Sequence, residues 1–392
     1  MNRIPDNGRH SNGRHGNDGQ NNARHSSDHH ISLLSRLMFH GYEGHFSKLR
    51  SDLGQVLTEA DLANSESDFA ELLKLADKHH VTMRALKVLE KFAGERQRAD
   101  LQEWCGKALH LESARISTAV EWLYAIVQSL QDCGCPVSVI KSLDHWPDLG
   151  SDLDLYTSGT PEQVIRIMRD RLQAQQEPRS WGDRLANKWN FQVPGLAELI
   201  EIHVRYLGQT GEQKLMASRV LERSVTKTVQ GRTFPVPALE ERILISTLQR
   251  MYRHFYFRLC DIADLAPLLA SGAVDFAELR RGAELGGIWP GVASFLVIVS
   301  NYVSDYVKDS ADDLRLPLDV TREAYSPDLR VHFRGNFLRV PIGSAAGLYG
   351  SQLLNASRHG DLRAISRLPL LPPLAVSALV AYHLTGSDKG VW

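Results

Sequence analysis

The chain has 392 residues, and its 45 lysines and arginines are balanced by 46 aspartates and glutamates. This length allows two or three domains with a sizeable core. The balanced charge gives no electrostatic drive toward nucleic acid or an anionic membrane, so a nucleic-acid partner is disfavoured. The four cysteines have neither zinc-site spacing nor the density of a disulfide framework, which favours a reducing compartment, the cytoplasm.

Residues 1–30 are polar and biased toward Asn, Gly, His and Arg. Such a segment buries too little apolar surface to offset its ordering entropy, so we predict a disordered tail and no secretory signal peptide. Residues 31–132 have apolar side chains at three- and four-residue steps, most clearly in Asp68–Phe92 and Leu111–Gln131. We therefore predict an N-terminal helical subdomain.

The apolar period changes from about 3.6 to 2 in residues 133–210. Short strands are expected at Val137–Lys141, in the segment SDLDLYT that begins at Ser151, at Trp189–Val193 and at Glu198–Leu207. A helix over 159–175 has the start signal Thr160-Pro161-Glu162, with Thr160 as the N-cap. These elements predict a small mixed sheet with a helix on one face.

Helical periodicity returns in residues 211–310, where Pro237–Gly272 is expected to form one long helix or two shorter ones. Residues 311–392 form an accessory C-terminal region. Within it Leu368–Tyr382 is apolar but carries three prolines and is too short to span a bilayer. We expect a buried helix there; contact with a membrane surface or a partner is the alternative.

Two aspartates interrupt the buried pattern of the second strand. Asp152 and Asp154 share one face of SDLDLY, and Glu201 lies on the polar face of the strand ELIEIHVRY. Closely spaced carboxylates repel one another unless a cation lies between them, and hard divalent cations require oxygen ligands. The pattern therefore indicates a divalent-metal site; a solvent-facing edge strand is the alternative reading.

Gly150 and Ser151 come directly before these acids. A glycine allows close backbone approach, and a serine hydroxyl with nearby backbone N–H groups can hold phosphate oxygens.

The sequence GSDLDLY followed by a helix resembles the Gly-Ser and Asp-x-Asp signature of the DNA polymerase beta-like nucleotidyltransferase superfamily. More narrowly, the chain resembles an uncharacterised nucleotidyltransferase family found in bacterial biosynthetic gene neighbourhoods. Further similarity lies in Leu75–Lys91, in Cys135–Asp144, in ELIEIHVRY and in the helical stretch after Pro237. The chain departs from the family where Glu201 replaces an aspartate and Ser142 replaces a glycine.

The resemblance implies an α+β fold, in which a small mixed-sheet nucleotidyltransferase core is flanked by N- and C-terminal helical regions. It also implies that Asp152, Asp154 and Glu201 bind one or two Mg²⁺ ions, which Mn²⁺ can replace, and carry catalysis. Gly150 and Ser151 would hold the β- and γ-phosphates. The reaction would transfer a nucleoside monophosphate from an NTP, such as ATP, to an unidentified acceptor, with release of pyrophosphate.

Other residues have two interpretations. Lys141 is either a phosphate contact or a solvent-facing lysine, and Arg205 either touches phosphate or forms a structural ion pair. His203 can orient Glu201. A substrate pocket lined by Arg250, Arg253, His254 and Arg258 is the alternative to a packed helix with a solvated basic face.

Three functions are weighed. The first is an enzyme that modifies a small molecule, sugar or natural-product precursor. The second is a catalytically degenerate nucleotide- or partner-binding module, and the third is a toxin-like nucleotidyltransferase that acts on tRNA or protein. The sequence does not predict an oligomeric state.

Overall fold

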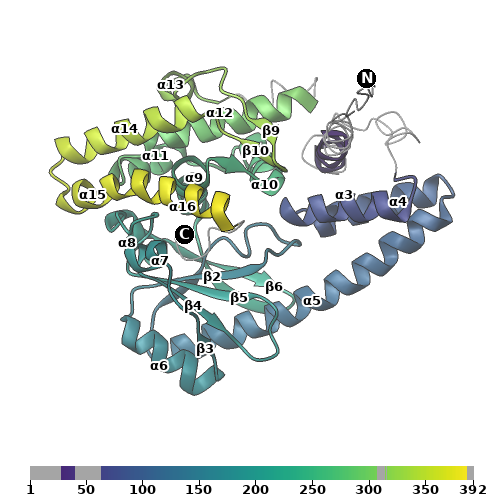
Figure 1. Ribbon diagram of the computed structural model, residues 1–392, viewed down its shortest axis with the longest axis horizontal. Helices are drawn as coiled ribbons and strands as arrows, with labels where there is room; N and C mark the ends of the chain where they lie inside the picture. The colour runs from purple at the N-terminus through teal and green to yellow at the C-terminus, as the bar shows by residue number, and fades with distance from the viewer. Residues whose placement is uncertain (1–27, 40–62, 307–313, 315, 386–392) are drawn as a thin grey trace, which may run out of the picture.

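The computed structural model describes residues 28–39, 63–306, 314 and 316–385. Within these ranges it confirms an α+β fold, in which helices surround one five-stranded mixed sheet and two small sheets (Figure 1). Most of the tail predicted over residues 1–30 lies outside the described residues, and the helix over 28–39 begins before that tail was expected to end.

The N-terminal half is helical up to the first strand. After the helix over 28–39 come α3 (Glu66–Lys78), α4 (Thr82–Glu95) and the long α5 (Ala99–Asp132). The first part of α5 packs on α4, and its second part lies along the sheet (Figure 1). This helix begins earlier than the predicted Leu111.

The five-stranded sheet has the order β1-β2-β5-β4-β3. Strands β2 and β5 are parallel, and the other neighbours are antiparallel. The strands are β1 (Val137–Val139), β2 (Asp152–Thr157), β3 (Gln175–Gln176), β4 (Lys188–Gln192) and β5 (Leu199–Val204). The helices between them are α6 (Pro161–Leu172) and α7 (Trp181–Ala186).

The start of α6 is as predicted, because the Thr160 side chain accepts a hydrogen bond from the Gln163 backbone and Pro161 is the first helical residue.

One face of the sheet is apolar and packs on α5 and α6. Its side chains form a core with apolar residues of both helices; the sheet contributes Leu153, Leu155, Ile200, Ile202 and Val204. The opposite face carries the acids and is covered by the segment that follows α9 (Leu239–Gln249). The polar face of β2 is therefore not a solvated edge: β2 lies between β1 and β5.

The stretch Pro237–Gly272 is more broken than predicted. After α9 come a π-helical turn, η2 (Arg250–His254), the short strand β8 (Tyr256–Phe257) and α10 (Leu259–Ala270). The hairpin of β6 (Ser224–Val229) and β7 (Arg232–Pro237) was not expected from the sequence.

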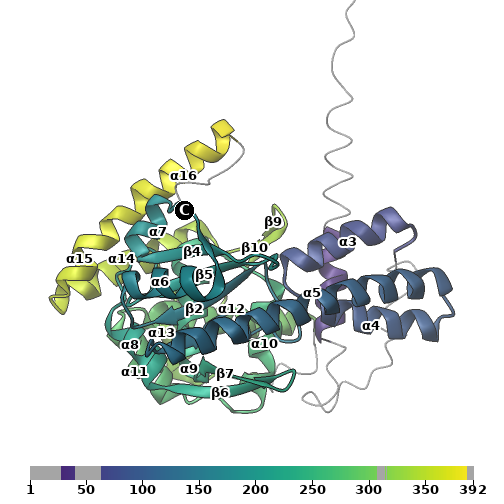
Figure 2. The same cartoon turned by 90° about the horizontal axis from the view of Figure 1, so that it is seen from below.

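The remaining elements are mainly helices, with two short strands among them (Figure 2). They are α8 (Leu215–Glu222), α11 (Phe276–Leu285), α12 (Trp289–Tyr306), α13 (Leu318–Glu323), β9 (His332–Arg334), β10 (Phe337–Arg339), α14 (Ile342–Arg358), α15 (Leu362–Arg367), η4 (Leu368–Leu370) and α16 (Leu371–Thr385). Strand β10 pairs with both β8 and β9, so the C-terminal region is joined to the segment that covers the acids.

The predicted buried helix at Leu368–Tyr382 is helical, but only its beginning is buried: Leu368 is 0% and Leu371 9% exposed, and the described side chains farther along are partly or fully exposed. Val376 and Val380 of α16 are 61% and 49% exposed, and its end projects from the body of the protein (Figure 2). Among the described residues, no helix combines the length and apolar character needed to cross a membrane.

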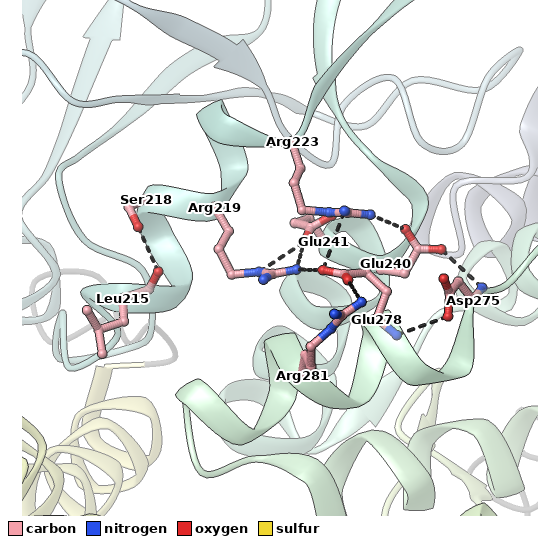
Figure 3. Close-up of polar contacts among 9 residues, drawn as sticks. All are labelled: Leu215, Ser218, Arg219, Arg223, Glu240, Glu241, Asp275, Glu278 and Arg281. Atoms are coloured by element: carbon pink, nitrogen blue, oxygen red, sulfur yellow. Dashed lines mark hydrogen bonds and ion pairs between the residues drawn. The ribbon is translucent and has the colours of Figure 1, made fainter.

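An ion-pair cluster fixes α8 and α11 against α9 (Figure 3). Arg219 donates to Glu241, which is 1% exposed, at 2.6 Å, and also contacts Glu278 on α11. Arg223 donates to the second oxygen of Glu241 at 2.9 Å. Because both oxygens of this buried carboxylate are paired, the cluster avoids the large cost of an isolated buried charge.

Candidate nucleotide and metal site

A cleft with a volume of about 160 Å³ lies between the acid face of the sheet and the segment that follows α9. Three further segments frame it: the end of β1, the loop before β2 and the turn after α3. Its lining residues are His80, Lys141, Ser142, His145, Gly150, Ser151, Asp152, Asp154, Glu201, Gln249, Arg250, Arg253, His254, Tyr256 and Arg258.

The strand register brings the acids together. Asp154 on β2 is the direct parallel partner of Glu201 on β5, and Asp152 lies one alternation earlier on the same face. Carboxylate oxygens of Asp154 and Glu201 and a ring nitrogen of His203 all lie within 4.8 Å of one another. Parallel pairing of the two strands is therefore what turns two sequence motifs into one cluster.

Lys141 places a positive charge between two of the acids. Its Nζ contacts Asp154 Oδ1 and lies 3.6 Å from Glu201 Oε1. The residue has a left-handed backbone with φ of 61°, an unfavourable conformation for a non-glycine residue that is found mostly where the surrounding structure enforces it. The ammonium thus occupies the position that a cation between the carboxylates would require.

Ser142 braces the acid-bearing strand. The Asp154 backbone N–H donates to Ser142 Oγ at 2.7 Å, and the hydroxyl lies 3.4 Å from the Asp152 carbonyl oxygen. A glycine at this position would lack the hydroxyl, so the serine adds support to β2.

Glu201 is held by a second lysine and a histidine. Lys188 Nζ, on β4, donates to Glu201 Oε2 at 2.8 Å and lies 2.8 Å from Asp183, and His203 Nε2 donates to Glu201 Oε1 at 2.9 Å. Burial acts to raise the pKa of Glu201, but Lys188, Lys141 and His203 outweigh it and hold that pKa well below its usual value. Glu201 is therefore ionised at neutral pH.

Asp152 lies at the open edge of the cleft and responds to the other acids. Loss of hydration, followed by the charges of Asp154 and Glu201, raises the pKa of Asp152 to about 6. Repulsion among the three carboxylates is thus only partly relieved by the two lysines, and a divalent cation would relieve it further. The donor set fits a hard cation such as Mg²⁺.

The wall opposite the acids is basic. The guanidinium of Arg253 makes no hydrogen bond or ion pair within the described parts of the chain. Among the described residues the Arg258 guanidinium hydrogen-bonds only to His80, with 3.2 Å between Arg258 Nη1 and His80 Nδ1. Burial and the nearby arginines hold the pKa of His254 well below its usual value, so this imidazole is neutral. The wall therefore offers two guanidinium groups for which the described residues provide no carboxylate partner.

The Gly150–Ser151 loop is packed closely. A Cβ on Gly150 would lie 2.7 Å from the His80 ring, and Arg115 donates to the carbonyl oxygens of Leu149 and Gly150 at 2.8 and 3.3 Å. Only glycine fits this position without a shift of His80. With its carbonyls fixed on one side, the loop is positioned to present Ser151, which is exposed, to the cleft.

Residues 65–303 match a family model described as "Uncharacterised nucleotidyltransferase". The chain belongs to this uncharacterised nucleotidyltransferase family. No curated protein and no solved structure matches the chain. Membership supports a general role in nucleotidyl transfer, with an NTP as substrate.

Most of the predicted site residues meet in the cleft. They are Lys141, Gly150, Ser151, Asp152, Asp154, Glu201, Arg250, His254 and Arg258. Arg250 is only 1% exposed and is paired with Asp261 at 2.7 Å, so it has less freedom to bind a ligand than Arg253. His203 lies behind Glu201 and lines a smaller adjoining cavity with Gln209 and Leu248.

Arg205, expected beside Glu201, lies outside the cleft. β5 ends at Val204, and Arg205 has φ of 67°, which breaks the alternation of the strand. Its side chain donates to the Gly159 carbonyl oxygen at 2.9 Å.

Sequence reasoning missed several residues of the site, above all Lys188, His80 and His145. Lys188 could have been found, because Lys188, Asn190 and Gln192 alternate with Trp189 and Phe191 and so define a polar face. His80 and His145 lie in turns, where the sequence has no periodic pattern from which the orientation of their side chains could be predicted.

Proposed function

We propose that the chain is a Mg²⁺-dependent nucleotidyltransferase that transfers a nucleoside monophosphate from an NTP to a hydroxyl of a small molecule, sugar or natural-product precursor, releasing pyrophosphate. The observation that carries the proposal is one cleft with two oppositely charged walls. Asp152, Asp154 and Glu201 form one wall, and the guanidinium groups of Arg253 and Arg258, which have no carboxylate partner among the described residues, form the other. A metal-bound triphosphate presents both signs of charge and matches this arrangement.

The acids and the loop have separate tasks in this proposal. Asp152, Asp154 and Glu201 would hold Mg²⁺, which supplies charge neutralisation at the reacting phosphate. Ser151 and nearby backbone N–H groups would bind phosphate oxygens.

The cations of the cleft orient the triphosphate. Arg253 and Arg258 bind its non-bridging oxygens, and a guanidinium is well shaped for such contacts. Lys141 contacts Asp154 and lines the same cleft, so it would be free to turn toward this ligand if a divalent cation took its place between the acids. Positioning and charge neutralisation are the main sources of rate in phosphoryl transfer.

Glu201 is better suited to binding a cation than to accepting a proton. A carboxylate whose pKa lies well below its usual value is a weak base at neutral pH. The low pKa therefore favours a role for Glu201 as a metal ligand over a role as the general base that deprotonates the acceptor hydroxyl.

A second candidate is a binding module without catalysis. It is favoured by one observation: both Glu201 oxygens are already bonded, one to Lys188 and the other to His203. If these bonds persist when nucleotide binds, the third ligand of the metal site is weak.

The four cysteines are free thiols. This agrees with a reducing compartment, and we propose a cytoplasmic location.

Nucleotide binding tests the proposal. Isothermal titration of each NTP with and without Mg²⁺ should reveal a Mg²⁺-dependent gain in affinity that the double variant Asp152→Asn and Asp154→Asn loses. The matched control is Asp132→Asn with Asp170→Asn, two exposed aspartates on α5 and α6. Absence of binding at millimolar NTP, or equal binding by both double variants, would refute the nucleotide site.

Pyrophosphate release separates the enzyme from the binding module. Hydroxyl-bearing acceptors are supplied with the NTP that binds, and pyrophosphate is measured with and without each acceptor. Acceptor-dependent release that the aspartate variant loses supports transfer; tight NTP binding with no release from any acceptor class supports the binding module.

A further inference from the structure

A second group of metal-ligating side chains lies beside the cleft and takes no part in the proposed transfer. His80, His145 and Cys260 each present one ligand atom, and the three atoms lie within 4.8 Å of one another. They come from the turn after α3, the loop between β1 and β2, and the start of α10. Because three separate segments supply one residue each, ligand spacing along the sequence gives no sign of the cluster.

The surroundings of these side chains match those of built metal sites. Cys260 is 0% exposed and His145 is 9% exposed. Nδ1 of His145 contacts Asp264, which leaves its Nε2 as the nitrogen available for a cation. A carboxylate behind a histidine ligand fixes the ring orientation and raises its basicity.

The supporting carboxylate is itself fixed. Asp264 accepts from Arg84 Nη1 at 2.6 Å, and Arg84 Nε donates to Asp148 at 2.5 Å. The Asp148 carboxylate in turn accepts from the Met83 backbone at the start of α4. The position of His145 is therefore determined by a chain of paired charges and not by loop packing alone.

His80 is held toward the same point. Its backbone has φ of 51°, a left-handed conformation that is unfavourable for a non-glycine residue. Its ring packs against Gly150 and lies 5.9 Å from that of His145, centroid to centroid.

We propose that His80, His145 and Cys260 bind a zinc-type cation beside the nucleotide cleft, with Asp264 orienting His145. Two imidazoles and one thiolate are donors that select Zn²⁺ over Mg²⁺, so this site and the carboxylate site accept different metals. His80 and His145 line the cleft whereas Cys260 lies behind them, and a fourth coordination position opens on the cleft side. On binding, the thiol proton of Cys260 passes to solvent.

Metal binding has a consequence for Arg258. In the structure this guanidinium lies against His80 Nδ1 at 3.2 Å. If the metal takes Nδ1, the acceptor is lost; if it takes Nε2, the neutral ring carries its proton on Nδ1. Either way Arg258 loses its partner and becomes available to an anion in the cleft.

Cobalt substitution tests the site, because a thiolate bonded to Co²⁺ gives a charge-transfer absorption that histidine ligands alone do not give. The full chain, free of any affinity tag, is stripped with a chelator and titrated with Co²⁺ and then with Zn²⁺. We expect one equivalent of Co²⁺ with thiolate absorption, displaced by Zn²⁺. The histidines of residues 1–30 can add weak binding but no thiolate band.

Matched variants assign the band. Cys260→Ala should abolish it, whereas Cys105→Ala, which removes another fully buried thiol on α5, should retain it. His80→Ala should weaken Zn²⁺ binding at least 100-fold. Circular dichroism verifies that each variant is folded. If Cys260→Ala does not fold, the proposal is tested by the presence of the band in the wild type and its weakening in His80→Ala. Absence of the band in the wild type, or its retention in Cys260→Ala, overturns the proposal.

The carboxylate site for Mg²⁺ and the thiolate site for Zn²⁺ can be tested independently, because a variant of one site leaves the other intact. The variant Asp152→Asn with Asp154→Asn should keep the cobalt band in full. Loss of the Mg²⁺-dependent nucleotide binding with an intact band therefore concerns only the carboxylate site, and loss of the band in Cys260→Ala concerns only the thiolate site.

Discussion

Acidification should destabilise the protein through His79, a buried histidine next to the site. His79 Nδ1 accepts from the Leu259 backbone N–H at 2.9 Å, and its Nε2 lies 3.1 Å from the Asn336 carbonyl oxygen. These bonds define a neutral imidazole that links the end of α3 to the start of α10 and to the β9–β10 turn. Burial lowers the pKa of His79 from 6.5 to about 4, against the opposing effect of the Asn336 bond.

The sign and size of the effect follow from the two pKa values. The unfolded chain takes up the proton near pH 6.5 and the folded chain only near pH 4, so the stabilisation is complete above pH 6.5 and is lost as the pH falls toward 4. The full difference is about 3 kcal/mol, of which about 2 kcal/mol is lost between about pH 7 and pH 5.

The assay compares urea unfolding of the wild type and His79→Gln across this pH range. The stability difference between the two proteins should shrink by about 2 kcal/mol from about pH 7 to pH 5, because only the wild type has this titration. His359→Gln, which removes an exposed histidine of the α14 terminus, should leave the pH dependence unchanged. Parallel pH curves for the wild type and His79→Gln would refute the reasoning.

Two further predictions concern the cleft. Lys188→Met should lower the free energy of unfolding by about 3–5 kcal/mol in a denaturant titration, because Glu201 then keeps a buried charge without its main partner; a loss below about 1 kcal/mol would show that solvent reaches Glu201. Gly150→Ala should weaken NTP binding, measured by calorimetry, because its Cβ would lie 2.7 Å from His80. Gly106→Ala on α5 is the control, because the nearest atom of another element to its Cβ would be Glu90 Oε1 of α4 at 3.6 Å. It should stabilise the helix by about 0.5–1 kcal/mol without changing NTP binding.

The carboxylate cluster could be predicted because strand periodicity and local capping determine it. Alternation fixes the common face of Asp152 and Asp154, and the Thr160 cap fixes the start of α6 directly after β2. Sequence alone left open whether β2 was an edge strand. The pairing of β2 with β5 makes β2 an internal strand of the sheet. This pairing joins segments more than 40 residues apart along the chain, so it is a non-local interaction that local sequence patterns do not determine.

The basic wall could not be predicted in its actual form. Met251, Phe255, Leu259 and Ile262 have helical spacing, which favours one continuous helix with its basic residues on the outside. In the structure a π-helical turn ends at His254, Phe255 adopts φ of 54°, and β8 begins. β8 is paired with β10, whose Leu338 lies opposite Phe257 across a large sequence separation.

The helix at Leu371–Thr385 gives a contrasting case. Its type was predictable from composition, but its exposure was not, because an apolar helix is expected to be buried. Just before this helix, two arginines of α15 contact backbone carbonyl groups between residues 185 and 211. Arg367 donates to the Leu185 and Thr210 carbonyl oxygens at 2.6 and 2.7 Å, and Arg363 donates to that of Gly211 at 2.7 Å.

The charges of the cleft are unequally satisfied, and this inequality predicts the order in which its ligands bind. On the sheet side Lys141 and Lys188 already pair with Asp154 and Glu201. On the opposite side Arg253 has no partner within the described chain, and Arg258 has only a neutral histidine.

The cleft therefore has a greater need for a bound anion, which would pair with these arginines, than for a bound cation. A triphosphate should bind measurably in the presence of a chelator, more weakly than with Mg²⁺, because the two guanidinium groups do not depend on metal for their contacts. Calorimetry without divalent metal tests this: Arg253→Met with Arg258→Met should abolish the residual binding. Asp152→Asn with Asp154→Asn should retain or strengthen it, because fewer carboxylates then repel the phosphates. If binding without metal is absent in the wild type, or is lost equally in both double variants, the acids and not the arginines govern entry of the nucleotide.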